Sequence, residues 1–183
     1  MKHTLLFLLM ICACTLQATA TGKQPRLTDD ELMTLVQKQT FRYFWDFAHP
    51  ESGLARERSN DRLEIATIGG SGFGVMAIIV GVERGFITRE QGAERLLKIV
   101  EFLNKADSYH GIWAHWMDGA TGKTIPFSRK DDGADLVESA FMFEGLLAAH
   151  QYFTHDNPTE NRIRGLINTC LLYTSPSPRD KRQ

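Results

Sequence analysis

The fold of this chain is decided by residues 68–91, IGGSGFGVMAIIVGVERGFITREQ. Residues 68–84 are apolar at almost every position, which predicts a very apolar helix. Gly85 follows where a left-handed residue commonly ends a helix. Thr88 and Gln91 then have the spacing of a capping box, which predicts the start of the next helix. Two helices joined by so short a turn pack as antiparallel neighbours.

Further helices are predicted on both sides of this pair. Thr28 and Glu31 form a second capping-box pattern, and apolar residues keep helical spacing from there to about residue 47. A fourth helix is expected over residues 134–153, and a fifth begins near residue 158. Consecutive helix pairs with one very apolar member predict an all-α fold of stacked α/α units.

Residues 106–132 separate the third and fourth helices and have no helical pattern. Residues 111–118 alternate as a strand does, 119–123 are turn residues, and 124–127 can return as the partner strand. An isolated hairpin is marginally stable in water, so we expect this β-hairpin (residues 111–127) to pack against the helices. Long loops on a rigid scaffold often hold functional sites.

The first twenty residues predict an export signal. A short polar segment precedes the apolar residues 5–16, and Ala18-Thr19-Ala20 supplies a small-x-small cleavage site. The apolar run is shorter than the ~20 residues that a membrane-spanning helix needs. We therefore expect a signal peptide over residues 1–20, a linker over 21–27, and a periplasmic or secreted protein. The alternative is a lipoprotein anchored through Cys14.

The C-terminal residues differ in sequence pattern from the predicted helices before them. Residues 170–180, CLLYTSPSPRD, resemble the translated read-through of a transposase-based sequencing adaptor, with each codon matching in order. They follow the amphipathic residues 162–168 with a Pro/Ser/Arg string that has no helix cap. We therefore expect the native domain to cover residues 28–169 and a non-native tail to cover 170–183. All three cysteines lie outside this domain, which excludes a disulfide framework within it.

Residues 131–138, DDGADLVE, lead into the fourth predicted helix. Asp135 and Glu138 are three residues apart and share a helical face near its N-terminus. Asp131 or Asp132 can cap this helix and complement its dipole, and acidic residues are common in a first turn. However, the helix has little polar face, and a carboxylate on a mostly buried helix needs a partner or a function. The residues themselves leave capping and chemistry equally open.

Two other features resemble ligand sites only superficially. The glycines of residues 69–74 match neither the dinucleotide fingerprint nor the P-loop, so close packing or a close backbone approach explains them better. His110 and His115 match no common zinc spacing. We therefore expect no metal and no cofactor. The net charge of −1 gives no reason to expect a nucleic-acid partner.

Four ordered blocks resemble the glycoamylase-like glycoside hydrolases, a family that includes bacterial endo-β-1,2-glucanases. The blocks are residues 40–54, 72–90, 113–123 and 132–140, and together they span roughly residues 27–169. The resemblance implies the N-terminal part of an (α/α)6 toroid with a carbohydrate cleft at one end of its barrel. Five helices are predicted where a full toroid needs twelve, so we expect this fragment to be inactive by itself.

The resemblance also implies roles for particular residues. Asp135 and Glu138 match the acidic motif and are the expected catalytic carboxylates, with Asp131 or Asp132 before them. Glycoside hydrolysis usually needs two carboxyl groups flanking the bond, roughly 5–10 Å apart, so one of them can lie outside this chain. Acid and base are not assigned. The expected substrate-binding residues are Trp113, His115 and Trp116 on the hairpin, and Asp132.

The implied function is carboxylate acid/base hydrolysis of a β-linked glucan or related oligosaccharides. The alternative is a catalytically inactive, carbohydrate-binding domain of the same fold; an exported helical scaffold without a ligand is a third reading. The expected partner is an oligo- or polysaccharide, with no nucleic acid and no membrane span. The sugar linkage, endo or exo action, stereochemical outcome and oligomeric state stay open.

Overall fold

The computed structural model describes residues 26–60 and 62–174. This part contains five helices and three short strands: α2 (Asp29–Trp45), β1 (Ile65–Thr67), α3 (Ile68–Glu83), α4 (Arg89–Leu103), β2 (Trp116–Asp118), β3 (Thr124–Ile125), α5 (Leu136–Tyr152) and α6 (Pro158–Thr174). The mainly helical architecture confirms the predicted fold class. The predicted signal peptide and the last nine residues of the predicted tail lie outside the described residues, so both stay predictions.

The described residues up to Leu35 form one structural unit, and those from Val36 onward form a second. In the first unit, the Thr28 amide N–H donates to Glu31 Oε2 at 2.8 Å. The Glu31 amide N–H donates back to Thr28 Oγ1 at 3.3 Å. These two bonds confirm the predicted capping box, which satisfies amide groups that a helix N-terminus otherwise leaves without partners.

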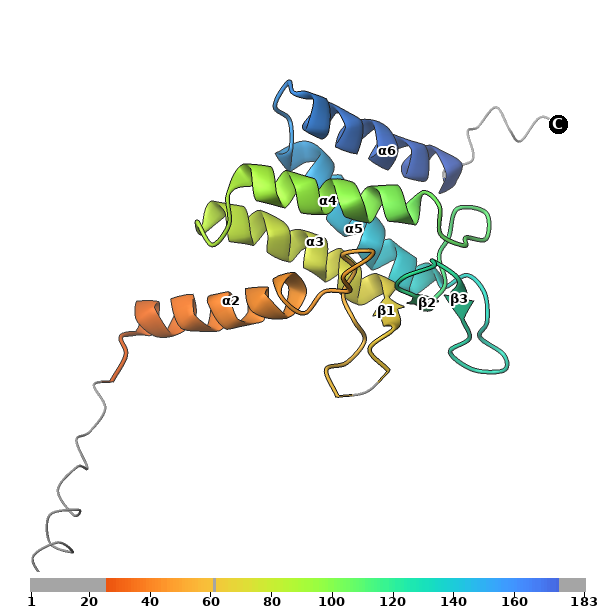
Figure 1. Cartoon of the computed structure of the whole chain (residues 1–183), viewed down its shortest axis with the longest axis horizontal. Coiled ribbons are helices and arrows are strands. Elements are labelled where there is room, and N and C mark those ends of the chain that lie inside the picture. The colour runs from red at the N-terminus through yellow and green to blue at the C-terminus, as the bar shows by residue number, and fades with distance from the viewer. Residues whose placement is uncertain (1–25, 61, 175–183) are drawn as a thin grey trace, which may run out of the picture. The chain divides into compact units, whose positions relative to one another are not determined.

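Within the second unit the helices lie in two layers. Helix α3 lies beside α5, and α4 lies beside α6 (Figure 1). The turn between α3 and α4 is built as predicted. Gly85 has a left-handed φ of 67°, and the Thr88 capping box has both of its hydrogen bonds. Because each turn reverses the chain, α3 and α5 begin at the same end of the unit, and α4 and α6 begin at the opposite end.

The backbones of α3 and α5 touch. A Cβ on Gly72 would lie 2.2 Å from the carbonyl oxygen of Phe141, and one on Gly145 would lie 2.5 Å from the carbonyl oxygen of Gly72. No real side chain tolerates such distances, so both positions require glycine. The glycine-rich start of α3 therefore serves close helix packing, as the sequence indicated.

The core fills the space between the two layers. In α4 the predicted apolar face is confirmed, because Leu96, Val100 and Leu103 are fully buried and Leu97 packs against them. Fully buried partners come from the other helices, among them Ile68, Val75, Met142, Leu146, Phe153, Ile163 and Ile167. Among the described residues, no helix has both the length and the apolarity that crossing a bilayer requires.

The predicted hairpin is present but shorter than expected. Strand β2 pairs with β3 in antiparallel register, with Trp116 opposite Ile125. A third strand, β1, pairs with the other edge of β2, with Ala66 opposite Met117. The sequence gives no sign of β1, because three buried residues that run directly into a helix have no readable alternation. The sheet joins the start of α3 to the hairpin.

Helix α6 continues past the predicted domain boundary at residue 169, since it ends at Thr174. Cys170 is buried and belongs to the core cluster. The predicted fifth helix, which begins near residue 158, therefore continues through residue 169 in the structure. The non-native origin of the tail stays a prediction.

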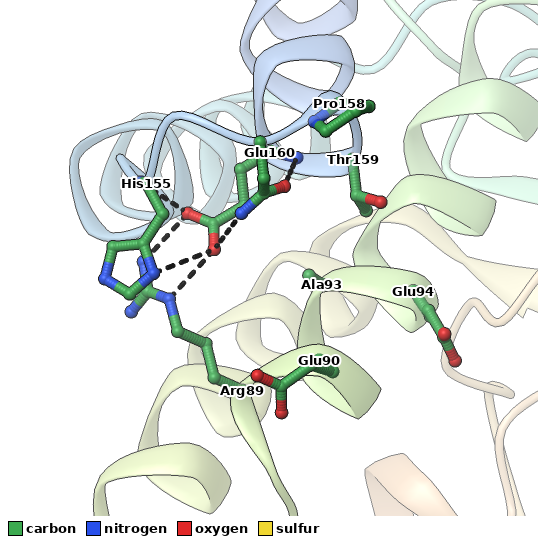
Figure 2. A pocket seen from close by; sticks show the side chains of 9 residues that line it. Arg89, Glu90, Ala93, Glu94, His155, Pro158, Thr159 and Glu160 are labelled. Atoms are coloured by element: carbon green, nitrogen blue, oxygen red, sulfur yellow. Dashed lines mark hydrogen bonds and ion pairs between the residues drawn. The ribbon is translucent and has the colours of Figure 1, made fainter.

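A buried ion pair joins α4 to α6 (Figure 2). Arg89 donates to both carboxylate oxygens of Glu160 at 2.9 Å and to the carbonyl oxygen of Tyr152 at 2.8 Å. The Glu160 carboxylate also accepts from the His155 amide N–H at 2.8 Å. Its side chain is only 3% exposed. Burial by itself would raise the pKa of Glu160, but the bonds from Arg89, His155 and Asn157 outweigh it and hold the pKa below its ordinary value.

We predict that Glu160→Gln lowers the free energy of unfolding by about 3 kcal/mol, because it leaves the Arg89 charge without its partner. Urea unfolding followed by circular dichroism measures the change. The matched control is Glu101→Gln. Glu101 pairs with Arg162 at 2.6 Å between the same two helices, but these side chains are 35% and 62% exposed. This control substitution should lower the free energy of unfolding by less than about 1 kcal/mol.

The penalty of Glu160→Gln should depend on pH. A lowered folded-state pKa contributes stability that is fully present above the unfolded value of 4.5 and is lost as the pH falls through the folded value. The difference between the native chain and Glu160→Gln should therefore shrink below pH 4.5. Equal costs for the two substitutions at neutral pH would contradict the role of the buried pair.

Candidate active site

Asp135 is the N-cap of α5. Its Oδ1 atom accepts hydrogen bonds from the amide N–H groups of Val137 at 2.9 Å and Glu138 at 3.0 Å. Its own amide N–H donates to the carbonyl oxygen of Trp113 at 2.8 Å, which ties the cap to the segment before β2. The cap that the sequence suggested for Asp131 or Asp132 is thus supplied by Asp135 instead. Its second carboxylate oxygen, Oδ2, takes no part in the cap and faces His115.

Glu138 lies in the first turn of α5 and reaches across to α3. Its Oε2 atom accepts a hydrogen bond from the Gly69 amide N–H at 2.8 Å. Gly69 is in the first turn of α3, where backbone N–H groups lack helical partners. A Cβ at Gly69 would lie 2.4 Å from Glu138 Oε2, so a larger residue there would displace the carboxylate from this position. The Glu138 side chain is 20% exposed.

His115 lies between the two carboxylates. Its Nδ1 atom is 3.3 Å from Asp135 Oδ2, and its Nε2 atom is 3.9 Å from Glu138 Oε1. The His115 carbonyl oxygen accepts from the Ile68 amide at 3.1 Å, which fixes the histidine to the start of α3. The structure therefore brings together three of the predicted site residues, two from the start of α5 and one from the residue before β2.

Aromatic rings surround this histidine. The ring of Phe127 stacks on His115 with centroids 4.4 Å apart, and Trp116 meets Phe127 at 4.6 Å. Phe127 was part of the predicted return strand but not of the predicted site. Only its contact with His115 in the folded chain shows that Phe127 belongs to the site. Its 46% exposure leaves a ring surface available beside the histidine.

Trp113 is placed differently from the expectation. It is 2% exposed, and its ring packs on Phe143 with centroids 5.1 Å apart. Its Nε1 group donates to the carbonyl oxygen of Leu103 at 3.3 Å. A ring whose faces and N–H are taken up by the core has no surface left for a sugar. We therefore leave Trp113 out of the substrate-binding set.

Asp131 and Asp132, the two acidic residues that the sequence offered before Asp135, lie in different surroundings. Ligand atoms of Asp131, His115 and Asp135 lie within 4.8 Å of one another, and this group has the composition to hold a cation. Asp132 is exposed, and the contact that involves it is a hydrogen bond from the Tyr109 hydroxyl to its carbonyl oxygen at 3.4 Å. Of the two alternatives that the sequence left open, Asp131 is the one near the histidine.

Glu138 and His115 open into a cavity of about 360 Å³. Its wall combines the start of α3, the first turn of α5, the end of α2 and the loop after it, and is formed by Tyr43, Phe44, Ala55, Arg56, Glu57, Thr67, Gly69, Gly70, Phe73, His115, Glu138 and Phe141. Most of these residues were not predicted, because they come from segments distant in sequence. A carboxylate with one oxygen fixed and one directed toward an imidazole can hold or transfer a proton.

No family model matches the sequence. Known proteins nevertheless match it closely. The chain is 53% identical over 143 residues to an exo-β-1,2-glucooligosaccharide sophorohydrolase (non-reducing end) from Parabacteroides distasonis, which covers 78% of this chain. A solved structure of an endo-β-1,2-glucanase from Chitinophaga pinensis, in complex with sophorotriose and glucose, matches 81% of the chain with 49% identity and a TM-score of 0.78. Over most of its length the chain is therefore similar to β-1,2-glucan-cleaving glycoside hydrolases.

A third match agrees with this similarity. A crystal structure from Bacteroides uniformis, whose glucoamylase assignment is provisional, is 80% identical, with a TM-score of 0.81 over 82% of this chain. The family resemblance predicted from the four sequence blocks is thus confirmed, and so is the fold as part of the family's toroid. The chain spans 20% of the sophorohydrolase and 37% of each of these two structures.

We predict that Gly69→Ala destabilises the protein by about 0.5–1.5 kcal/mol, because the new methyl group displaces the Glu138 carboxylate from its hydrogen bond with the amide of residue 69. Removing that carboxylate should remove the conflict. In the double variant Gly69→Ala/Glu138→Ala, the added cost of the alanine at residue 69 should therefore be smaller. A double-mutant cycle in urea measures this coupling.

Gly165→Ala is the matched control, since a Cβ there meets nothing within 4 Å. On this open side of α6, the better helix propensity of alanine should stabilise the protein by about 0.5–1 kcal/mol. A cost at Gly69 that is the same with and without the Glu138 side chain would show that the two residues are not coupled.

Proposed function

We propose that the protein is a glycoside hydrolase that cleaves β-1,2-linked glucan or its oligosaccharides. The observation that carries the proposal is the grouping of Glu138, His115 and Asp135 beside one cavity. The linkage comes from the relatives, two of which are described as β-1,2-glucan-cleaving enzymes. A carboxyl group beside an imidazole at the wall of a cleft suits acid/base attack on a glycosidic bond.

The hydrogen bonds suggest different roles for the two carboxylates. Asp135 uses one oxygen to cap α5 and the other to face His115 Nδ1. Both oxygens are thus engaged within the protein, which suits a residue that orients the histidine. Glu138 has one oxygen on the Gly69 N–H, while its Oε1 atom is 3.9 Å from the nearest histidine nitrogen. We therefore assign contact with the scissile bond to Glu138.

Hydrolysis needs a second carboxyl group on the other side of the bond. Asp131 is a further described carboxylate near His115. We propose that it, or a residue outside the described part of the chain, supplies this group. Trp116 and Phe127, which flank His115, are the proposed aromatic border of the cleft, since sugar rings stack on exposed aromatic faces. Asp132 stays a predicted substrate contact at the exposed edge of the same loop.

The proposal is tested in a chimaera in which residues 28–169 replace the equivalent segment of the 80% identical Bacteroides uniformis protein. We expect this chimaera to hydrolyse linear β-1,2-glucan or sophorotriose. Glu138→Gln should lower kcat by about 100- to 10,000-fold, the usual contribution of acid/base catalysis, while sophorotriose still binds. Product analysis by chromatography and calorimetric titration measure both quantities.

The matched control is Glu144→Gln, which changes an exposed glutamate on the same helix and should leave kcat unchanged. Full activity of the Glu138→Gln protein would refute the assignment of Glu138. Binding of sophorotriose without any turnover, where the unmodified relative is active, would instead favour the inactive carbohydrate-binding alternative.

A further inference from the structure

Arg56 lines the same cavity as Glu138 and His115, yet the proposed chemistry gives it no task. It follows the fully buried Leu54 and the buried Ala55. Its backbone forms a β-bridge with Ala66 in β1, and its carbonyl oxygen accepts from the Tyr43 hydroxyl at 2.9 Å. The residue is therefore anchored on both sides, to the sheet and to α2.

The side chain of Arg56 is also held in place. Its guanidinium carbon lies 4.8 Å from the centroid of the Phe47 ring, within the range of a cation–π contact. This contact holds the guanidinium over the ring without using its N–H donors. An arginine held by a ring keeps its donors available for another molecule.

One of those donors, the Nε group, is without an acceptor in the described part of the chain. Arg56 Nε is buried and has no hydrogen-bond partner there. By contrast, the half-buried Arg89 binds Glu160 and Tyr152, and Arg95 donates to the Trp45 carbonyl oxygen at 3.1 Å. A buried donor without an acceptor costs free energy, so a ligand that supplies the acceptor binds favourably.

The rest of the cavity wall indicates what this ligand is. Glu57 and Glu138 also line the cavity, and two carboxylates disfavour an anionic ligand. Phe73 and Phe141 add a pair of rings with centroids 5.2 Å apart, and these side chains are 55% and 43% exposed. A neutral molecule with hydroxyl groups at its edge and an apolar ring face fits both kinds of wall. A glucosyl unit has both features.

We propose that Arg56 is a substrate-binding residue whose guanidinium donates hydrogen bonds to hydroxyl oxygens of the glucosyl unit in this cavity. The inference rests on the proposed function and adds a specificity determinant to it. The planar fork of arginine can bind two neighbouring oxygens at once, whereas lysine offers a single point charge. Arg56 thus contributes to substrate affinity, and Glu138 contributes to turnover.

The test compares Arg56→Lys and Arg56→Gln in the chimaera. Arg56→Lys keeps the charge over Phe47 but removes the fork, so we expect KM for sophorotriose to rise at least about tenfold with kcat changed less than about threefold. Arg58→Gln is the control, because Arg58 is a neighbouring arginine whose side chain is 63% exposed and lies outside this cavity. It should leave KM unchanged. Thermal melting verifies that each variant is folded.

Binding alone distinguishes this inference from the proposed function. Sophorotriose is titrated into the Glu138→Gln protein with and without Arg56→Lys. A weaker affinity in the double variant supports the role of Arg56 even if hydrolysis by the chimaera proves to need another carboxylate. Unchanged KM in Arg56→Lys and unchanged affinity in the double variant would overturn the inference, whatever the activity of Glu138.

Discussion

The contact between the backbones of α3 and α5 is the constraint on which the rest of the structure depends. Gly72 and Gly145 let the two helices touch, and a methyl group at either position would overlap the opposite backbone. Because the helices are so close, their first turns are close as well. Glu138 in α5 can then place its carboxylate on the Gly69 N–H of α3. The candidate site is thus a direct consequence of glycine packing.

The same geometry separates the site from the strongest polar contact of the scaffold. Helices α3 and α5 begin at one end of the unit, where Asp135, Glu138 and His115 meet. Helices α4 and α6 begin at the other end, where Arg89 and Glu160 form their buried pair. Polar groups therefore accumulate at both ends of an otherwise apolar core. One set is fully paired within the protein, and the other opens into a cavity.

Structural features that depend on residues close together in the sequence were predictable, and contacts between residues far apart in the sequence were not. The two capping boxes and the Gly85 turn depend on residues at most three or four positions apart, so the sequence predicts them correctly. The buried character of α5 also indicated that Glu138 needs a partner. The partner itself, Gly69, is 69 positions away and could not be predicted. Arg56 and Phe127 acquire their places only when the chain folds. Trp113 shows the opposite case, in which an aromatic residue expected at the cleft packs in the core.

A saccharide-bound structure tests the central claim most directly, namely that the α3–α5 contact places Glu138 at the bond to be cleaved. The measurement is a crystal structure of the chimaera carrying Glu138→Gln, with sophorotriose bound. We predict that the side-chain amide at residue 138 lies within hydrogen-bond distance of a glycosidic oxygen, while the Gly69 N–H still contacts that side chain. A trisaccharide bound in the cleft with residue 138 remote from every glycosidic oxygen would contradict the account.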